Sequence, residues 1–428
     1  MKTLDRDLQQ RLLHINCALA RTVQRDWAAQ PVRARLSLVK NLRHEIADQA
    51  RELASAAAAV ADRPVSEKLI SEVLPLADAC RWLEREAASI LAPRYHGRRH
   101  RPFWLSGASF SVQHQALGLV LVIGPRNYPL FLPAVQALHA LVAGNAVLLK
   151  PAPGTREVAL LFRRLFIAAG LDPRLLTILP EDISAGIAAV DIGVDKVFFT
   201  GSSEHGRDLL QQLAVTNTPS VMELSGEDAV IGLADADIDL MVRAIRFGLH
   251  WNNGDTCIAP RRILAHHSIA RQLRAHLVRA GVDSLPVKTF ADENDTIHLT
   301  SQSKFALGVS IFSRDARRAT ALAGRITTGF AIINDLLVPT ADPRLPFGGV
   351  RASGFGVTRG REGLLEMTHP HAVVVRRGRS RRHYEPLGAG DDKLFAACIA
   401  AAHGRSFPDR CRALRCVFRA IVRRKEKK

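Results

Sequence analysis

The chain has 428 residues, 47% of them hydrophobic, and 59 Lys and Arg against 41 Asp and Glu give it a formal net charge of +18. This length and apolar content suffice for two or three lobes with buried cores. Residues 376–428 carry 16 of the basic side chains and 5 of the acidic ones, so much of the positive excess lies in a C-terminal tail. A basic tail on a more balanced body argues against a nucleic-acid-binding core.

The cysteines and the N-terminus bear on metal binding and on the compartment. The six cysteines form no CxxC pair and show no Cys/His spacing typical of a zinc site, so we expect no bound metal. The N-terminus carries charges of both signs, unlike a signal peptide, and the longest apolar runs fall short of the ~20 residues of a membrane span. We therefore expect a cytoplasmic protein with reduced thiols, in which Cys17, Cys80 and Cys398 are small buried hydrophobes.

Apolar residues recur near a period of 3.6 through residues 1–95, which predicts helices. From about residue 116, short apolar runs alternate with helical segments. We predict strands at 119–123, 146–149, 175–179, 197–200 and 221–224, and helices at 133–142, 155–169, 183–190 and 204–213. This alternation is typical of a parallel sheet covered by helices, in which ligands bind outside the carboxyl ends of the strands.

Cys257 lies in a Gly-containing loop between a predicted helix at 237–251 and a predicted strand at 262–265. Reactive groups are often placed on such loops. A catalytic thiol needs a base and a donor for the oxyanion, and the chain offers Glu223 at the end of one predicted strand and Asn127 soon after another. These three residues make covalent thiol chemistry on a carbonyl the leading hypothesis.

Five sequence blocks resemble those of the aldehyde dehydrogenase superfamily, and within it the class 3, or fatty aldehyde, type. In chain order they are Gly124–Pro129, Gly144–Pro151, Phe199–Gly206, Glu223–Gly226 followed by the Cys257 loop, and Leu345–Gly356. Each block alone is a weak signal. Their common order makes the resemblance specific, with Glu223 and Cys257 34 residues apart, and it covers roughly residues 30–375.

The resemblance implies oxidation of an aldehyde to a carboxylic acid with NAD or NADP as cofactor. Cys257 would attack the aldehyde to give a thiohemiacetal, and the side-chain amide of Asn127 with the backbone N–H of Cys257 would stabilise its oxyanion. After hydride transfer, Glu223 would activate the water that hydrolyses the thioester, with its pKa raised by partial burial. Thiol chemistry without a cofactor, such as ester hydrolysis, is a further alternative.

The same resemblance assigns six residues to cofactor binding: Lys150, Gly201, Ser202, Gly206, Leu224 and Phe347. Lys150 would bond the adenine ribose. Gly201 and Ser202 would approach the pyrophosphate at a helix N-terminus, where Gly206 would allow close packing. Phe347 would lie beside the nicotinamide ring.

The fold implied is α/β, of aldehyde dehydrogenase type, with a Rossmann-type cofactor domain. Its parts would be a dinucleotide-binding domain of residues 1–95 and 116–224, a shortened catalytic domain of residues 225–350, bridging segments at 96–115 and 365–380, and a basic tail at 381–428. Bridging segments join family members into dimers, so we expect a homodimer. The strand-like residues 109–115 and 371–376 are the candidates for that contact.

The chain departs from the family pattern after Cys257. A Glu-x-Phe-Gly-Pro block, whose glutamate would hold the nicotinamide ribose, is absent, and only residues 258–284 precede a sequence that resembles the part just past it. A catalytically impaired relative, acting as a binding or structural subunit, is therefore the alternative function. Pro153 replaces a glutamate that often selects NAD, which leaves the choice between NAD and NADP open. Asp255, two residues before Cys257, is expected to raise the pKa of the thiol.

From Asp409 to residue 428, apolar residues fall on one helical face and most arginines on the others. A basic amphipathic helix can lie on an anionic membrane, where each basic residue contributes about 1 kcal/mol. The alternative is a docked or frayed C-terminal helix. Peripheral membrane contact would suit a long-chain aldehyde as substrate.

Overall fold

The structure is a computed structural model that describes residues 2–282, 284–377, 382–384 and 386–425. Contacts divide the chain into two units, Met1–Tyr95 with Ser111–Val373 and His96–Phe110 with Val374–Lys428. The first unit contains two parallel sheets and every residue of the predicted site. The second contains the two C-terminal helices, α15 (Asp391–His403) and α16 (Phe407–Lys425), which pack on each other.

The larger sheet has six strands in the order β15-β7-β6-β3-β4-β5. They are β3 (Leu119–Ile123), β4 (Ala146–Lys150), β5 (Leu176–Ile178), β6 (Lys196–Thr200), β7 (Ser220–Glu223) and β15 (Gly354–Phe355). Five are parallel, and β15 pairs antiparallel with β7. The chain builds β3, β4 and β5 in one direction and then adds β6 and β7 on the other side of β3, which makes the sheet doubly wound. The predicted α/β fold is confirmed, and all five predicted strands form.

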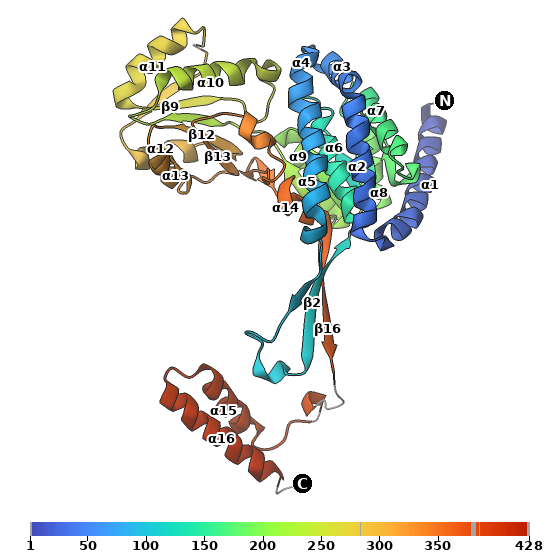
Figure 1. The fold of residues 1–428 in the computed structure, drawn as a ribbon, viewed down its shortest axis with the longest axis vertical. Coiled ribbons are helices and arrows are strands. Elements are labelled where there is room, and N and C mark those ends of the chain that lie inside the picture. The colour runs from blue at the N-terminus through green and yellow to red at the C-terminus, as the bar shows by residue number, and fades with distance from the viewer. Residues whose placement is uncertain (1, 283, 378–381, 385, 426–428) are drawn as a thin grey trace. The chain divides into compact units, whose positions relative to one another are not determined.

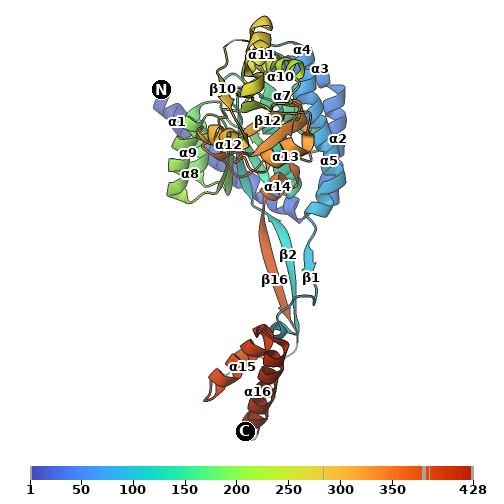
Figure 2. The same ribbon diagram turned by 90° about the vertical axis from the view of Figure 1, so that its left-hand side faces the viewer.

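Helices cover this sheet because parallel strands are buried on both faces. Those that follow its strands are α6 (Phe131–Ala143), α7 (Arg156–Ala168), α8 (Ile183–Ile192) and α9 (Ser203–Thr216), and the N-terminal ones are α1 (Lys2–Ala29), α2 (Val32–Asp48), α3 (Ala50–Ala61), α4 (Val65–Lys68) and α5 (Leu74–Ile90). Figure 1 labels the helices that lie over the sheet, among them α2, α5, α6 and α9. Figure 2 shows α8 and α9 on one side of the sheet and α2 and α5 on the other. Every residue of α6 is buried, as its all-round apolar sequence requires. A π-helical turn, η1 (Leu69–Val73), joins α4 to α5, and such turns often mark functional sites.

The second sheet has five parallel strands in the order β10-β9-β8-β12-β13. They are β8 (Ala229–Gly232), β9 (Arg262–His266), β10 (Val287–Phe290), β12 (Gly308–Phe312) and β13 (Phe330–Ile333), connected by α10 (Ile238–His250), α11 (His267–Arg279), α12 (Glu293–Ser301) and α13 (Ala316–Ala323). Only residues 280–286 separate α11 from β10, which pairs with β9 from Val287 opposite Ile263. The short stretch after Cys257 therefore closes into a continuous sheet.

The remaining strands are short or lie near the ends of the first unit. They are β1 (Arg94–His96), β2 (Ala108–Ala116) and β16 (Thr368–Arg376), in a sheet of order β1-β2-β16, and β11 (Phe305–Ala306) with β14 (Val350–Arg351); α14 (Gly360–Leu365) precedes β16. The segments predicted as strands at 109–115 and 371–376 fall within β2 and β16. Residues 378–381, 385 and 426–428 of the predicted bridging segment and tail lie outside the described residues.

The cysteines outside the predicted site differ in burial. Cys17 and Cys80 are buried as expected, whereas Cys398 is only half-buried, because α15 packs mainly on α16 alone. Among the described residues no helix combines the length and the apolar content needed to cross a membrane. In the same part of the chain, no group of three or more His, Cys, Asp or Glu side chains is arranged to hold a metal ion.

Candidate active site

The predicted site residues of the larger sheet lie at one edge of it. Asn127 follows β3, Lys150 ends β4, Gly201 and Ser202 follow β6, and Glu223 ends β7. Because these strands are parallel, their carboxyl ends meet at the same edge, close to the point where the strand order reverses between β3 and β6. The apolar runs that alternate with helices in the sequence form parallel strands, and this brings residues that are distant in the chain together.

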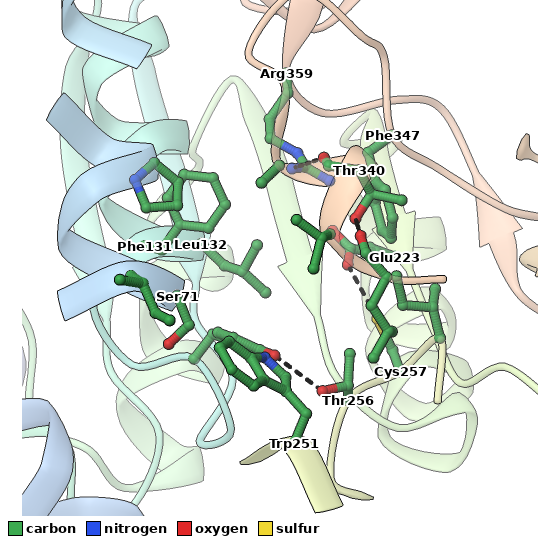
Figure 3. Close-up of a pocket in the computed structure, with 17 residues that line it drawn as sticks. Ser71, Phe131, Leu132, Glu223, Trp251, Thr256, Cys257, Thr340, Phe347 and Arg359 are labelled. Carbon is green, nitrogen blue, oxygen red and sulfur yellow. Dashed lines mark hydrogen bonds between the residues drawn. The ribbon is translucent and has the colours of Figure 1, made fainter. Parts of the chain in front are cut away.

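Cys257 reaches this edge from the second sheet. It follows α10 through the tight turn η4 (Trp251–Gly254), in which Asn252 and Asn253 have φ of 49° and 57°. Asparagine tolerates this left-handed conformation better than most residues. The turn brings Cys257 Sγ to 4.0 Å from Glu223 Oε1 (Figure 3). The predicted nucleophile and base are therefore in contact.

Two cavities meet at this pair, and a third adjoins one of them. The Trp251 cavity, of about 110 Å³, is lined by Trp251, Phe131, Phe347 and Arg359 among others. The Asn127 cavity, of about 520 Å³, contains Asn127, Ser202, Leu224 and Asp255, and the Lys150 cavity, of about 390 Å³, contains Lys150, Ile183, Gly186 and Phe199. Cys257 and Glu223 line both the Trp251 and the Asn127 cavities, and Gly201 lines both the Asn127 and the Lys150 cavities. The thiol thus lies at the junction of a small apolar cavity and a larger polar one.

Burial sets the protonation of the reacting groups. It raises the pKa of Glu223 to about 7, against the opposing effects of Arg359 and of the nearby Thr200 and Thr358 hydroxyls. Burial also raises the pKa of Cys257 well above its usual range, and the nearby Glu223 and Asp228 carboxyls raise it further. The resting pair near neutral pH is therefore a thiol beside a carboxyl group that is about half ionised.

Asp255 was expected to raise the pKa of the Cys257 thiol, but it is not the cause of the raised pKa. The pKa of Cys257 is raised, but by burial and by Glu223 and Asp228. Asp255 is exposed, so water screens its carboxylate from the thiol. Asp228 is 7% exposed and follows the Glu223 block, where nothing in the sequence marks it as buried.

Asn127 is half-buried in a loop that contacts the Cys257 loop. Its side-chain Nδ2 donates to the backbone oxygen of Asp255 at 2.6 Å, and its Oδ1 accepts from the backbone N–H of Tyr128 at 3.0 Å. An amide nitrogen has two N–H groups, so one donor remains for a ligand. The amide lines the same cavity as Cys257 Sγ, which is the placement that an oxyanion donor requires.

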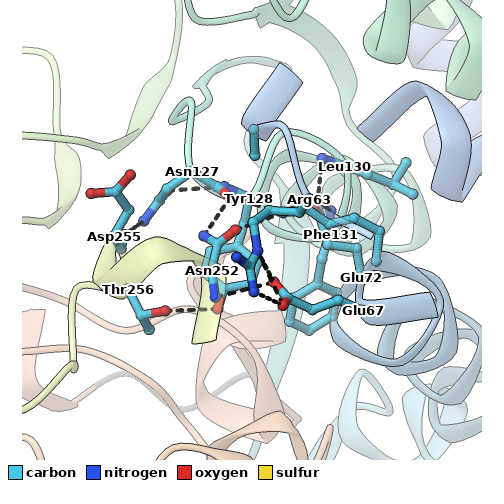
Figure 4. Close-up of polar contacts among 12 residues, drawn as sticks. Arg63, Glu67, Glu72, Asn127, Tyr128, Leu130, Phe131, Asn252, Asp255 and Thr256 are labelled. Carbon is cyan, nitrogen blue, oxygen red and sulfur yellow. Dashed lines mark hydrogen bonds and ion pairs between the residues drawn. The ribbon is translucent and has the colours of Figure 1, made fainter. Parts of the chain in front are cut away.

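A buried ion pair, Lys68–Glu72, holds the two loops in position. Figure 4 shows Glu72 beside Leu130 and Phe131. Lys68 and Glu72, both fully buried, lie 3.0 Å apart across the π-helical turn. Glu72 Oε2 accepts from the backbone N–H groups of Leu130 and Phe131 at 2.8 and 3.1 Å. Burial raises the pKa of Glu72, and Lys68 and these N–H groups oppose that rise. The carboxylate therefore fixes the end of the Asn127 loop.

The same pair reaches the Cys257 loop through Asn252. Lys68 Nζ donates to Asn252 Oδ1 at 2.9 Å and lies 3.4 Å from the backbone oxygen of Asn127, to which Asn252 Nδ2 also donates at 3.0 Å. Arg63 pairs with Glu67, whose carboxylate accepts from the backbone N–H of Asn252. Sequence reasoning missed these residues because charged residues on a helix usually face water.

Arg359 is a further residue that the sequence did not single out. Its side chain is buried, lies over the rings of Phe347 at 4.4 Å and Phe131 at 5.5 Å, and donates through Nη1 to the backbone oxygen of Thr340 at 2.6 Å. Phe347 also stacks on Phe330 at 5.2 Å. Phe347 therefore lines the Trp251 cavity and neither of the cavities that contain the other predicted cofactor residues.

Two residues of the Trp251 cavity have unusual backbone conformations. Arg359 has φ 60° and ψ 174°, a region that is essentially restricted to glycine, and Leu337 has φ 62° and ψ −66°, in a turn closed by a hydrogen bond from Val338 N to Leu336 O. Each such residue costs about 1–3 kcal/mol and persists only where its surroundings hold it. Such strain is concentrated at functional sites.

Comparisons with known proteins identify the family of the chain. The family model described as "Aldehyde dehydrogenase family" matches residues 6–287 and 284–373. The chain belongs to the aldehyde dehydrogenase family. It is an NAD(P)-dependent aldehyde dehydrogenase, which oxidises aldehydes to carboxylic acids.

Individual relatives of this aldehyde dehydrogenase are distant. A 4,4'-diapolycopene aldehyde oxidase of Methylomonas sp is 29% identical over 88% of this chain and 84% of its own length. Aldehyde dehydrogenase family 3 member H1 of Arabidopsis thaliana is 25% identical over 79% of this chain and 84% of its own. A solved structure of a putative aldehyde dehydrogenase from Burkholderia cenocepacia is 22% identical, with a TM-score of 0.80 over 88% of this chain and 92% of that one, which shows a shared fold.

The cofactor side of the site fits a dinucleotide. Lys150 is 6% exposed at the wall of its cavity, and burial lowers its pKa against the opposing charges of Asp182 and Glu181. Helix α9 begins after Ser202, with its N-terminus at the Asn127 cavity. A Cβ on Gly206 would lie 2.6 Å from Leu224 Cδ2, so any other residue there would force Leu224 to shift. A buried donor, a helix N-terminus and adjoining cavities are what a ribose and a pyrophosphate require.

Proposed function

We propose that this aldehyde dehydrogenase oxidises a long apolar aldehyde through a covalent intermediate on Cys257. The observation that carries the proposal is the contact of Cys257 Sγ with Glu223 Oε1 at 4.0 Å, at the junction of an apolar cavity and a polar one. An aldehyde entering from the apolar side and a dinucleotide entering from the polar side would meet at the sulfur. Catalysis of this kind depends on such positioning.

The first step is attack by sulfur on the aldehyde carbon. Because the resting group is a thiol, its proton must leave, and the ionised fraction of Glu223 is the acceptor within reach. The free N–H of Asn127 Nδ2 and the backbone N–H of Cys257 then stabilise the oxyanion of the thiohemiacetal. NAD(P)+ supplies the hydride acceptor when bound.

Hydrolysis of the thioester is the second task of Glu223, after it has released the proton of the thiol to the solvent. Its carboxylate takes a proton from water as the water attacks the acyl carbon, and the carbon–sulfur bond breaks. A pKa of about 7 suits this role, since the group must accept and release a proton near the operating pH. Lys150, Gly201, Ser202, Gly206 and Leu224 would hold the cofactor, and Phe347 would pack beside the reacting groups from the apolar side.

A long apolar substrate is supported by the walls of the Trp251 cavity. They are mostly aliphatic and aromatic, including Phe131, Leu132, Trp251, Leu337 and Phe347. The class 3 type is supported by the 25% identity to a family 3 member, and a related enzyme is named for an aldehyde of 4,4'-diapolycopene. An apolar aldehyde gains free energy on entering such a cavity, at about 25 cal/mol for each Å² of apolar surface buried.

The domains are proposed as residues 1–95 and 116–224 for the cofactor, 225–350 for catalysis and 96–115 with 365–380 for bridging. The catalytic domain is proposed to be shortened, since α11 is followed so soon by β10 and the Glu-x-Phe-Gly-Pro block is absent. Loss of a ribose contact would weaken cofactor binding. An impaired enzyme that serves as a binding subunit is the alternative that this feature favours.

The bridging strands support a homodimer. In the described part of the chain, β16 has β2 as its strand neighbour, and its residues are mostly exposed. An exposed edge strand of nine residues is a ready site for pairing with a second copy. Molar mass from light scattering would test this, and a monomer at micromolar concentration would contradict it.

The C-terminal unit supports peripheral membrane contact from the cytoplasmic side. Several large apolar residues of α15 and α16 are exposed, namely Phe395, Ile399, Phe407, Leu414 and Phe418. Arginines flank them on α16. Vesicles with anionic lipid should sediment the protein and neutral vesicles should not, because the basic residues supply the added attraction.

The proposed activity is tested by the formation of NADH or NADPH with a series of straight-chain aldehydes from C3 to C12. We expect kcat/KM to rise with chain length, and to be lost in Cys257→Ser. No reduced cofactor with any aldehyde, from protein whose circular dichroism shows it to be folded, would leave the impaired subunit as the function. Ester hydrolysis that depends on Cys257 and needs no cofactor would instead favour thiol chemistry without a cofactor as the function.

A further inference from the structure

The Trp251 cavity collects buried polar atoms that have no partner. Ser71 Oγ, Glu223 Oε2 and Arg359 Nε are all buried without a hydrogen bond among the described residues, and all three residues line this cavity. Buried polar groups are nearly always bonded in folded proteins. Three exceptions around one cavity indicate that water or a polar ligand completes them.

Arg359 is the most unusual of the three. Its side chain is 4% exposed, its one recorded hydrogen bond goes to Thr340, and no carboxylate of the described residues forms an ion pair with it. A buried charge without a counterion is costly, so such charges are almost always paired or ligand-bound. The strained backbone of Arg359 adds to this cost. Figure 3 shows its guanidinium above Glu223, with Thr340 and Phe347 beside it.

The charge of Arg359 is only partly balanced by its neighbours at neutral pH and is not balanced at mildly acidic pH. Among the described residues that line the cavity, the other groups that can ionise are Glu223, Cys257 and Tyr128. The pKa of Glu223 is about 7, and burial raises the pKa values of Cys257 and Tyr128. Below pH 7 the cavity therefore contains a lone cation among apolar walls.

We propose that Arg359 forms a carboxylate-binding subsite in the Trp251 cavity, beside Cys257 and Glu223. A planar guanidinium binds carboxylates with two parallel hydrogen bonds, and Arg359 has free N–H groups for this purpose. The volume of about 110 Å³ is somewhat below that of the ~150 Å³ apolar cavities that bind benzene. It takes a carboxylate group and the first carbons of its chain.

The carboxylate has two chemical sources, and one follows from the proposed function on which this inference then rests. Hydrolysis of the thioester breaks the carbon–sulfur bond and forms a carbon–oxygen bond. One proton of the water returns to the sulfur, the other goes to Glu223, and the acid remains as a carboxylate beside Arg359. The second source is an aldehyde that already carries a carboxylate at its other end.

Binding without cofactor tests the subsite independently of turnover. Isothermal titration calorimetry at pH 6.5 compares hexanoate with hexanamide, which has nearly the same shape but no charge. A charge-assisted bond favours hexanoate by about 10- to 100-fold. Arg359→Met keeps most of the side-chain volume and should abolish the preference, and Arg359→Lys should retain part of it. Arg126→Met removes an exposed cation of the Asn127 cavity and should leave the preference intact.

Equal affinity of the wild-type protein for the two ligands would overturn the proposal, as would a preference that survives Arg359→Met in folded protein. If Arg359→Met does not fold, loss of most of the preference in a folded Arg359→Ala decides instead. Steady-state kinetics separate the two sources. Inhibition of hexanal oxidation by hexanoate, competitive with the aldehyde, identifies the product, whereas faster oxidation of 6-oxohexanoate than of hexanal identifies an acidic substrate. Failure of turnover with a retained hexanoate preference would contradict the proposed function alone.

Discussion

Two groups of buried charges lie on either side of the Asn127 loop, and they differ in how they are satisfied. Lys68 and Glu72 face each other, and each bonds backbone or amide groups of the active-site loops. Glu223 and Arg359 line one cavity without an ion pair, and Glu223 Oε2 and Arg359 Nε have no hydrogen bond among the described residues, whereas Glu72 Oε1, which also has none, is paired with Lys68 at 3.0 Å. We call the Lys68–Glu72 group closed, because its two charges pair with each other, and the Glu223–Arg359 group open, because its charges form no ion pair with each other.

The closed pair supports the active-site loops, whereas the open group lies where we propose that the reaction takes place. A closed pair in a low-dielectric interior is rigid, because any movement leaves a charge unpaired. An open pair is held in place by the structure around it, at a cost in stability. Its unused donors and acceptors remain available to a ligand. Functional sites in proteins are often less stable than they could be for this reason.

The largest effect is expected on the open side, from Cys257→Ser. Loss of the nucleophile should lower kcat for aldehyde oxidation by at least ~10³-fold, because a serine hydroxyl is a much weaker nucleophile at neutral pH. Initial rates of NADH or NADPH formation measure it. Cys416→Ser, at an exposed cysteine, is the matched control and should retain wild-type rates.

The base is expected to matter nearly as much. Glu223→Gln should lower kcat by about 10²–10⁴-fold, the usual contribution of general base catalysis. In the wild type, kcat/KM should rise with pH through about 7, because the raised pKa leaves Glu223 protonated and inactive below that value. The rise should be absent in the variant. Glu86→Gln, at an exposed carboxylate on α5, should change neither the rate nor its pH dependence.

The closed side is expected to respond in stability. Lys68→Met should lower the free energy of unfolding by about 3–5 kcal/mol, because Glu72 is left as a buried charge without its partner. Urea denaturation followed by circular dichroism measures the loss. The double variant Lys68→Met/Glu72→Leu should recover most of that stability, since no charge is then buried, but should keep a reduced kcat because the Asn127 loop loses its anchor. Full recovery of kcat would contradict a positioning role.

The smallest effect is expected from Asp255→Asn. The carboxylate is exposed and screened, and the contact with Asn127 is made by its backbone oxygen, which the substitution leaves in place. We expect kcat/KM to change by less than about threefold, within the usual effect of a surface substitution. A large gain in rate would show that Asp255 does suppress the thiol, as the sequence first suggested.

Much of the fold could be predicted from the sequence. The apolar runs at β3, β4, β6 and β7 are short, bounded by turn residues and separated by helices, and that pattern is local. Cys257, Glu223 and Asn127 could be named because each belongs to a recognisable block. Their meeting at one edge follows from the topology of parallel strands. Phe347 was assigned to the cofactor, but its ring lies in the apolar cavity, a placement that depends on how its segment folds back.

The sequence by itself therefore determined the architecture and the family and supplied the candidate site residues, since hydrophobic periodicity and short motifs are properties of neighbouring residues. Only the tertiary structure decided which charges are buried and which are paired. Asp228, Arg359 and the Lys68–Glu72 pair resemble ordinary surface residues in the sequence, and they lost their water because segments far apart in the chain packed over them. Desolvation sets their energies and the pKa of Glu223, and it exists only once the chain has folded.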